Sequence, residues 1–322
     1  MIQSKHIFRS KTIQTEITYQ AKIKNMSRRS QFIFFFMAIG LFFSCEDEID
    51  QQLEEADAKM VVDAWLNNLD EDQIVRLTFS QPLMNTDQAP SIDNAEVVIT
   101  SGDLVINTQA LGDGQYKLDP HDFGPVGTEY TLSITLANGQ RYTSTTRMED
   151  VPVIDSIVSE FREDEVFGPD GYYAQFYSRD LPGLGNTYWI KTYKNGMFLN
   201  DPFEINIAYD AAFDAGGMLD NFVFITPIRE LINPILTDEQ IEDEIAPYTP
   251  GDRIRVEIHS ISNAAFDFME VARDQLQNGS NGIFAAPIAN TVGNIESLDT
   301  DEVVLGIFNV AKVNSAEITV EE

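Results

Sequence analysis

The chain has 322 residues, with 21 Lys and Arg against 52 Asp and Glu, and a formal charge of −31 at pH 7. So acidic a chain lacks the basic surface that phosphate backbones attract, which excludes nucleic-acid binding. Cys45 is the only cysteine, so no disulfide can form within the chain and the fold must rest on its hydrophobic cores.

The N-terminal region is predicted to be a lipoprotein signal peptide, and we exclude it from fold reasoning. Residues 26–44 read MSRRSQFIFFFMAIGLFFS: Arg28 and Arg29 precede a continuous apolar run over residues 32–43. This run is too short to span a bilayer as a helix. Cys45 follows a small serine, so we expect Cys45 to carry the lipid that attaches the protein to a membrane. A lone buried cysteine is the alternative.

Residues 1–25 do not fit this signal, because they carry scattered Lys and Arg and would make an unusually long basic leader. The gene start is predicted to lie too far upstream, with translation beginning at Met26. A genuine basic extension is the alternative.

Residues 45–58 are predicted to be an acidic tether, since like charges keep a linker extended. Glu46, Asp47 and Glu48 directly follow Cys45, and this run resembles the signal that exports Bacteroidota lipoproteins to the cell surface. Residues 1–44 hold seven of the 21 Lys and Arg residues and one of the 52 Asp and Glu residues. Residues 45–322 therefore keep 14 basic and 51 acidic residues, and their formal charge is 14 − 51 = −37. Anionic membranes would repel this part of the chain, which leaves the lipid as the attachment.

Residues 59–150 are predicted to form an immunoglobulin-like or transthyretin-like sandwich, because short alternating segments follow one another at close spacing. Residues 73–80 place Val75, Leu77 and Phe79 on one face. Gly102-Asp103 and Asn138-Gly139 are typical of tight hairpins. Residues 130–137 alternate apolar with Thr and Ser, as in a strand with one solvated face.

Residues 151–322 are predicted to form a second β-rich domain with one amphipathic helix. Strands are expected at 153–161, 171–178, 186–193, 197–199, 222–225, 251–260, 303–308 and 316–320, with a hairpin at Asn195-Gly196. A short helix is expected to begin at Thr237, where Thr-Asp-Glu-Gln resembles a capping box. From Ser262 to Leu276 the apolar period becomes helical. The predicted buried face of that helix comprises Ala265, Phe268, Met269, Ala272 and Leu276.

This order of features resembles domain-of-unknown-function family 4249, a family of outer-membrane lipoproteins of Bacteroidota. Besides the Cys45 signal and the helix after Ser262, the matching segments are KMVVDAWL (59–66), SIDNAEV (91–97), GDGQYKL (112–118), GTEY (127–130), PVIDS (152–156) and VLGIF (304–308). They are fold signatures and bring no catalytic residues. The resemblance implies a lipid-anchored protein of the outer membrane that often accompanies a TonB-dependent transporter.

A search for catalytic motifs finds none, so we expect no enzyme and no cofactor. No G-x-S-x-G pentad occurs, and a lipidated Cys45 cannot act as a thiol nucleophile. Zinc needs clustered His and Cys ligands, whereas His121 and His259 fall in different predicted domains. His259 is expected on the solvated face of its strand. Paired carboxylates of a glycosidase are defined in space, so the sequence leaves that possibility open.

Two groups of residues are candidates for binding. Asp210, Asp214 and Asp220 lie in a glycine-bearing loop and are candidate calcium ligands, as are Asp119 and Asp122, although a solvated loop is the simpler interpretation. Aromatic residues are dense on the predicted strands, and the half that points outward could stack on a sugar or peptide. These aromatic residues are Tyr172, Tyr173, Phe176, Tyr177, Tyr188, Trp189 and Tyr193.

Three functions follow as hypotheses. The first is a non-catalytic lipoprotein on the cell surface that binds a TonB-dependent transporter or its cargo. The second is a surface adhesin or a glycan- or peptide-binding module, for which a sandwich suffices because fold alone does not fix function. The third, an envelope hydrolase, rests only on the abundance of carboxylates. The sequence names neither the ligand nor the oligomeric state.

Overall fold

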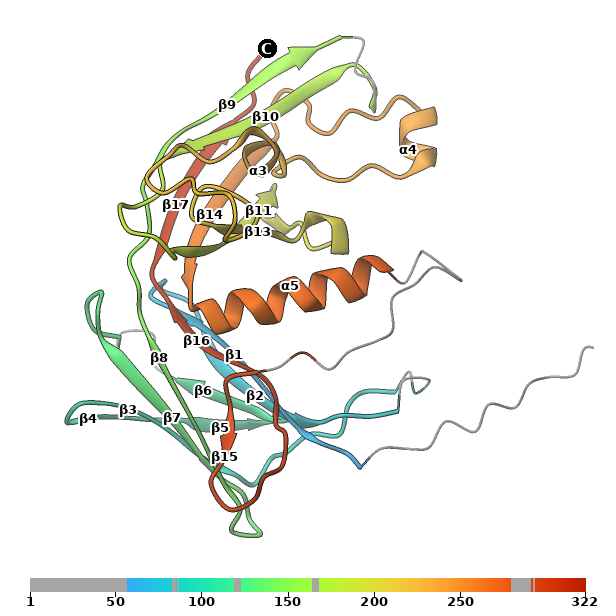
Figure 1. Cartoon of the computed structure of the whole chain (residues 1–322). Helices are drawn as coiled ribbons and strands as arrows, with labels where there is room; N and C mark the ends of the chain where they lie inside the picture. The colour runs from blue at the N-terminus through green and yellow to red at the C-terminus, as the bar shows by residue number, and fades with distance from the viewer. Residues whose placement is uncertain are drawn as a thin grey trace, which may run out of the picture. The chain divides into compact units, whose positions relative to one another are not determined.

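The structure is a computed structural model, and it describes residues 57–82, 85, 87–118, 123–163, 168–278, 291 and 293–322 (Figure 1). The predicted signal peptide, Cys45, the export residues Glu46, Asp47 and Glu48, and His121, Asp119 and Asp122 lie outside the described residues. None of the helices in the described ranges is long and apolar enough to cross a membrane.

The chain is mainly β, as predicted, and its first part is a sandwich of two sheets. The strands are β1 (Met60–Asn67), β2 (Gln73–Phe79), β3 (Glu96–Ser101), β4 (Leu104–Asn107), β5 (Gln109–Gly112), β6 (Gln115–Leu118), β7 (Glu129–Thr135) and β8 (Arg141–Arg147). One sheet has the order β16-β1-β2-β6-β5 and the other β15-β8-β7-β3-β4. The strands β15 (Glu296–Ser297) and β16 (Leu305–Ala311) come from the C-terminal part of the chain.

Period-two alternation builds the sandwich core. Val75 and Leu77 on β2 are fully buried, and Phe79 packs against the same core, as the alternation predicted. Leu132 and Ile134 on β7 are buried opposite them in the second sheet. The hairpins predicted at Gly102-Asp103 and Asn138-Gly139 are confirmed by the antiparallel β3–β4 and β7–β8 pairs.

A late strand completes the first sheet. β16 pairs in parallel with β1 over seven residue pairs, from Val61 with Leu305 to Asn67 with Ala311. Phe308 and Val310 on β16 are buried in the sandwich core. The segment after residue 150 therefore contributes to this core too, and residues 56–322 form one compact unit.

The second part of the chain is built on a twisted sheet of order β12-β11-β14-β17, with β13 paired to β11. Its strands are β11 (Thr187–Lys194), β12 (Met197–Phe198), β13 (Asn206–Tyr209), β14 (Arg253–Ile261) and β17 (Val313–Thr319), and β9 (Ile154–Arg162) and β10 (Gly171–Ser178) form a separate antiparallel ribbon. Ile190, Val256 and Ile258 share a core with Ala174 and Phe176 of the ribbon. The hairpin at Asn195-Gly196 is confirmed by the β11–β12 pair.

Short helices lie in the long connection between β13 and β14. α4 (Asp238–Glu242) begins after Thr237, whose hydroxyl accepts from the Gln240 N–H while the Gln240 side chain accepts from the Thr237 N–H, so the predicted capping box is confirmed. The strand predicted at 222–225 is wrong, because this segment makes only a bridge from Val223 to Arg179 before α3 (Thr226–Glu230). The 3₁₀ turn Pro202–Glu204 and β13 lie between the strands predicted at 197–199 and 222–225, where no element was predicted.

The helix α5 (Asn263–Asn278) packs across β13 and β16, between the two parts of the chain (Figure 1). Ala265, Phe266 and Met269 are buried with Ile207 of β13 and Ile307 of β16. The predicted buried face is therefore correct at Ala265 and Met269, whereas Phe268 and Leu276 are less buried than predicted.

Two positions of that predicted face are corrected. Leu276 is 57 % exposed, because it lies in the last turns of the helix, beyond the buried residues that reach only to Met269. Phe268 is only partly buried, with its ring 6.5 Å from the Trp65 ring, whereas Phe266, which the sequence did not single out, is 3 % exposed.

Gly306 is predicted to be irreplaceable in β16. Its φ is +99°, and a Cβ there would overlap the Val62 carbonyl of β1. Gly306→Ala should lower the free energy of unfolding by about 1–3 kcal/mol from the backbone conformation, with a further loss from the overlap. Urea unfolding measures the total loss in Gly306→Ala and compares it with the loss in Gly139→Ala. Gly139→Ala is the matched control, because its φ is +90° and nothing lies within 4 Å of the added Cβ. Equal losses in the two variants would contradict the close β1–β16 approach.

The docking of α5 predicts a gradient of stability losses along the helix. Phe266→Ala should cost about 3–5 kcal/mol because it leaves a cavity in a closed core. Phe268→Ala should cost less, and Leu276→Ala about 0.5 kcal/mol or less, as is usual for surface substitutions. Thermal and urea unfolding of the three variants test this order. A loss at Leu276 as large as that at Phe266 would contradict the observed helix orientation.

Candidate functional site

The aromatic residues on β11 divide between two faces, as the alternation predicted. Tyr188 is 1 % exposed and belongs to the core under the ribbon, together with Phe176 of β10. Trp189 and Tyr193 lie on the opposite face of β11 and are half-buried. The Trp189 ring meets the ring of Trp65 on β1 edge-on at 5.3 Å, so part of this face is covered by the sandwich. It is not an open stacking surface.

Charged side chains fill the space between these rings and form what we call the charged aromatic cluster, comprising Trp189, Lys191, Tyr193, Arg255, Glu257 and His259. The Lys191 Nζ lies 4.0 Å from the Trp189 ring centre. The Arg255 guanidinium lies 3.8 Å from the Tyr193 ring centre and pairs with Glu257. The strand register explains the cluster, because β11 pairs Trp189 with His259 and Lys191 with Glu257 on β14.

The expectation that His259 is a surface residue is wrong. His259 is 4 % exposed, and its Nε2 lies 3.0 Å from Glu257 Oε2. Since an ionised carboxylate only accepts, Nε2 carries the proton and donates it to Glu257. Alternation showed correctly which residues of β14 share a face. It could not show that α5 and the sandwich cover that face.

Burial and charge set the protonation of this pair. Burial lowers the pKa of His259, and the Lys191 cation lowers it further, against the opposing effect of Glu257. Burial alone would raise the pKa of Glu257, but the His259 hydrogen bond and the cations of Arg255 and Lys191 outweigh it and hold that pKa below its usual value. At neutral pH the cluster therefore holds a neutral imidazole beside a carboxylate. Among the described residues, the His259 side chain hydrogen-bonds only to Glu257, and no Ser or Thr hydroxyl bonds to it as a nucleophile would.

The calcium candidates serve as loop clamps. Asp210 is 3 % exposed, and its Oδ1 accepts hydrogen bonds from the N–H groups of Gly185 and Asn186 at 2.8 and 3.0 Å. Asp214 accepts from the Gly216 N–H, and Asp220 accepts from the Gly183 N–H. Within the described ranges, no group of three or more His, Cys, Asp and Glu side chains could hold a metal ion.

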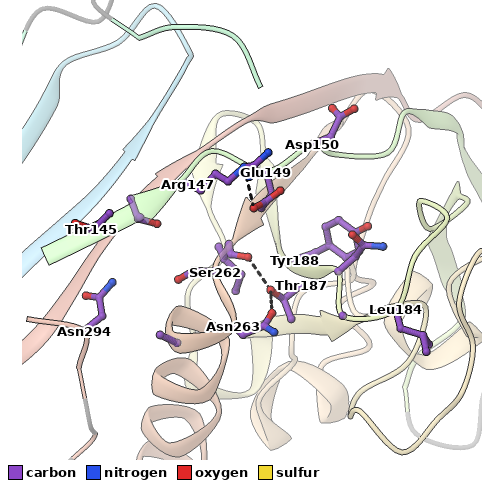
Figure 2. Close-up of a pocket in the computed structure, with 15 residues that line it drawn as sticks. Thr145, Arg147, Glu149, Asp150, Leu184, Thr187, Tyr188, Ser262, Asn263 and Asn294 are labelled. Carbon is purple, nitrogen blue, oxygen red and sulfur yellow. Dashed lines mark hydrogen bonds and ion pairs between the residues drawn. The ribbon is translucent and has the colours of Figure 1, made fainter. Parts of the chain in front are cut away.

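A polar cavity of about 460 Å³ lies where the end of β8, the β10–β11 connection and the start of α5 meet (Figure 2). Its lining is Thr145, Thr146, Arg147, Glu149, Asp150, Leu184, Gly185, Asn186, Thr187, Tyr188, Ile261, Ser262, Asn263, Ala264 and Asn294. Hydroxyl, amide and charged groups make up most of it. The sequence carried no signal for this site, because its walls come from separate segments spread between Thr145 and Asn294.

The segments that resemble the family are structural in this chain. In the segments 91–97 and 112–118, the Tyr116 hydroxyl donates to the Ile92 carbonyl at 2.7 Å and accepts from the Ala95 N–H at 3.0 Å, while Asp93 accepts from the Gly114 N–H. Gly306 of the segment 304–308 allows the close approach to β1. The residues named here hold strands and turns together and do not line the polar cavity, whereas Asn263 and Ala264, at the start of the helix that also resembles the family, do line it.

The buried His259–Glu257 pair predicts that the free energy of unfolding decreases as the pH is lowered from neutral. In the unfolded chain a histidine takes up its proton near pH 6.5, whereas the fold, with Lys191 facing His259 and only Glu257 and Glu71 opposing, resists that proton. Because the unfolded state then binds more protons, the free energy of unfolding should decrease from pH 7.5 to 5.5. Melting curves of His259→Gln, which cannot titrate, should show a shallower pH dependence than the wild type. Parallel curves would contradict a neutral buried His259.

Comparison with known proteins finds one family. The model of the family described as "Domain of unknown function (DUF4249)" matches residues 46–317. No curated protein matches the chain. Because the matched region covers most of the sequence, the protein belongs to the DUF4249 family.

Proposed function

We propose that the protein is a non-catalytic lipoprotein, anchored in the outer membrane by a lipid on Cys45 and exposed at the cell surface, where it binds a TonB-dependent transporter or the transporter's cargo. The observation that carries the anchor is the coincidence of two boundaries. The family match begins at residue 46, directly after the only cysteine and its signal-like leader. The same cysteine is where a lipid would join a folded unit to a membrane.

The non-catalytic part of the proposal is supported by the chemistry of the described residues. The one buried histidine, His259, is enclosed within the charged aromatic cluster and bonds only to Glu257. A general base must reach the proton that it takes from a substrate, and this imidazole is only 4 % exposed. The segments shared with the family position backbone, which favours a binding scaffold.

An adhesin or a glycan- or peptide-binding module is the second candidate. The observation that favours it is the polar cavity, whose walls combine donors and acceptors within about 460 Å³. Ligand sites are concavities of this size, with a few placed polar groups that fix orientation.

Cys45→Ala is predicted to release the protein from the outer membrane, because the acidic remainder has no other attachment. Fractionation of cells followed by immunoblotting measures this. Recovery of Cys45→Ala in the outer-membrane fraction at wild-type levels would contradict the lipid anchor. The matched control keeps Cys45 and replaces Glu46, Asp47 and Glu48 with Ala, and it should stay in the membrane but lose protease accessibility on intact cells.

Purification of the native protein in mild detergent tests the transporter partnership. We expect a TonB-dependent outer-membrane transporter to co-purify with the wild type and to be retained after a salt wash. Mass spectrometry identifies the partner, and an unrelated outer-membrane lipoprotein carrying the same tag is the control. Absence of a transporter from the wild-type preparation, or equal recovery with the control, counts against this function.

A further inference from the structure

We propose that the polar cavity is a binding site for a short, neutral saccharide. This inference rests on the proposed non-catalytic binding role and adds a ligand class to it. It is carried by the way the cavity walls are held and by the groups that those walls leave free.

Buried polar side chains hold the walls of the cavity in place. The Thr187 hydroxyl donates to the Ile261 carbonyl at 2.6 Å and lies 3.2 Å from Asn263 Oδ1, so the start of β11 is joined to the end of β14 and the start of α5 (Figure 2). The Ser260 hydroxyl donates to the Glu149 carbonyl at 2.8 Å, which joins β14 to the segment after β8. Thr187 and Ser260 are 4 and 1 % exposed.

Two further clamps fix the same walls. The Asn309 side chain accepts from the Ser262 N–H and donates to the Ser260 carbonyl, and the Asp210 carboxylate holds the N–H groups of Gly185 and Asn186. Burying a polar group costs free energy unless the group is hydrogen-bonded. The buried, hydrogen-bonded side chains around this cavity therefore fix the main chain of its walls in one conformation. A rigid wall lowers the ordering cost of binding.

Several groups on these walls retain hydrogen-bonding capacity. Asn263 Nδ2 has no acceptor within the described part of the chain, and Asp150 uses only Oδ1, for the Val151 N–H. The Arg147 guanidinium meets Glu149 at 3.6 Å, a loose contact that leaves most of its donors free. The walls therefore offer both donors, from Asn263 and Arg147, and an acceptor, from Asp150.

The charges and surfaces of the cavity select among ligand classes. One Arg against Glu149 and Asp150, on a chain with a charge of −31, disfavours an anion. The only aromatic ring of the lining, Tyr188, is 1 % exposed and offers no stacking face, which disfavours nucleobases and aromatic ligands. Leu184, Ile261 and Ala264 are too few to enclose a lipid chain. A neutral ligand that both donates and accepts at every position, as a saccharide does, fits what remains.

Saturation-transfer NMR and titration calorimetry on the full chain in detergent test this site. The probes are maltose, cellobiose, xylobiose, mannobiose and chitobiose. We expect at least one of them to bind, and Asn263→Ala, which removes the free amide, to weaken its binding about 3- to 10-fold. Asn200→Ala, exposed and outside the lining, is the control and should bind as the wild type does.

Each outcome bears on a separate statement. Failure of all five probes to bind, or equal binding by Asn263→Ala and the wild type, overturns the saccharide site and leaves the transporter partnership unaffected. Chromatography of the recovered probe separates binding from turnover. Recovery of monosaccharide products would overturn the non-catalytic role instead, and intact disaccharide is the expected result.

Discussion

The parallel pairing of β16 with β1 is the interaction on which the rest of the structure depends. It joins residues about 245 positions apart in the sequence and makes the last part of the chain a strand of the first sheet. β16 contributes Phe308 and Val310 to the sandwich core and Ile307 to the core beneath α5. One strand thus supports two cores, and its backbone can lie against β1 only because Gly306 has no side chain.

The two parts of the chain that β16 connects meet through apolar packing in one place and through polar groups in another. Trp65, Trp189 and Phe266 pack where α5 covers the C-terminal sheet. Beyond them lies the charged aromatic cluster, in which Glu257 accepts a hydrogen bond from His259 and is stabilised as a carboxylate by the Lys191 cation. At the N-terminal end of α5 the polar cavity opens, and the Asn263 side-chain amide there has no acceptor among the described residues. The closed cluster contributes to stability, and the open end is where we propose that a ligand binds.

Local features of this fold could be predicted from the sequence because local physics determines them. Gly139, Asn195 and Gly196 adopt the positive φ values that tight hairpins need, and strand alternation identified the buried face of β2. The β1–β16 pair could not be predicted, since a parallel partner leaves no trace in the spacing of either strand. His259 was misplaced for a related reason: alternation separates two faces without showing which one is covered. The cavity depends on both kinds of long-range information.

The central claim is that the β1–β16 pair makes residues 56–322 one cooperative unit, despite the domain boundary that the sequence predicted at residue 150. Native-state hydrogen exchange of the full chain, resolved by peptide, tests it most directly. The account predicts that amides of β1, β16 and β14 exchange with the same free energy of opening, and that this value equals the global free energy of unfolding. Exchange of β14 and its neighbours at a distinctly lower free energy than β1, with separate urea midpoints for the two parts, would contradict it.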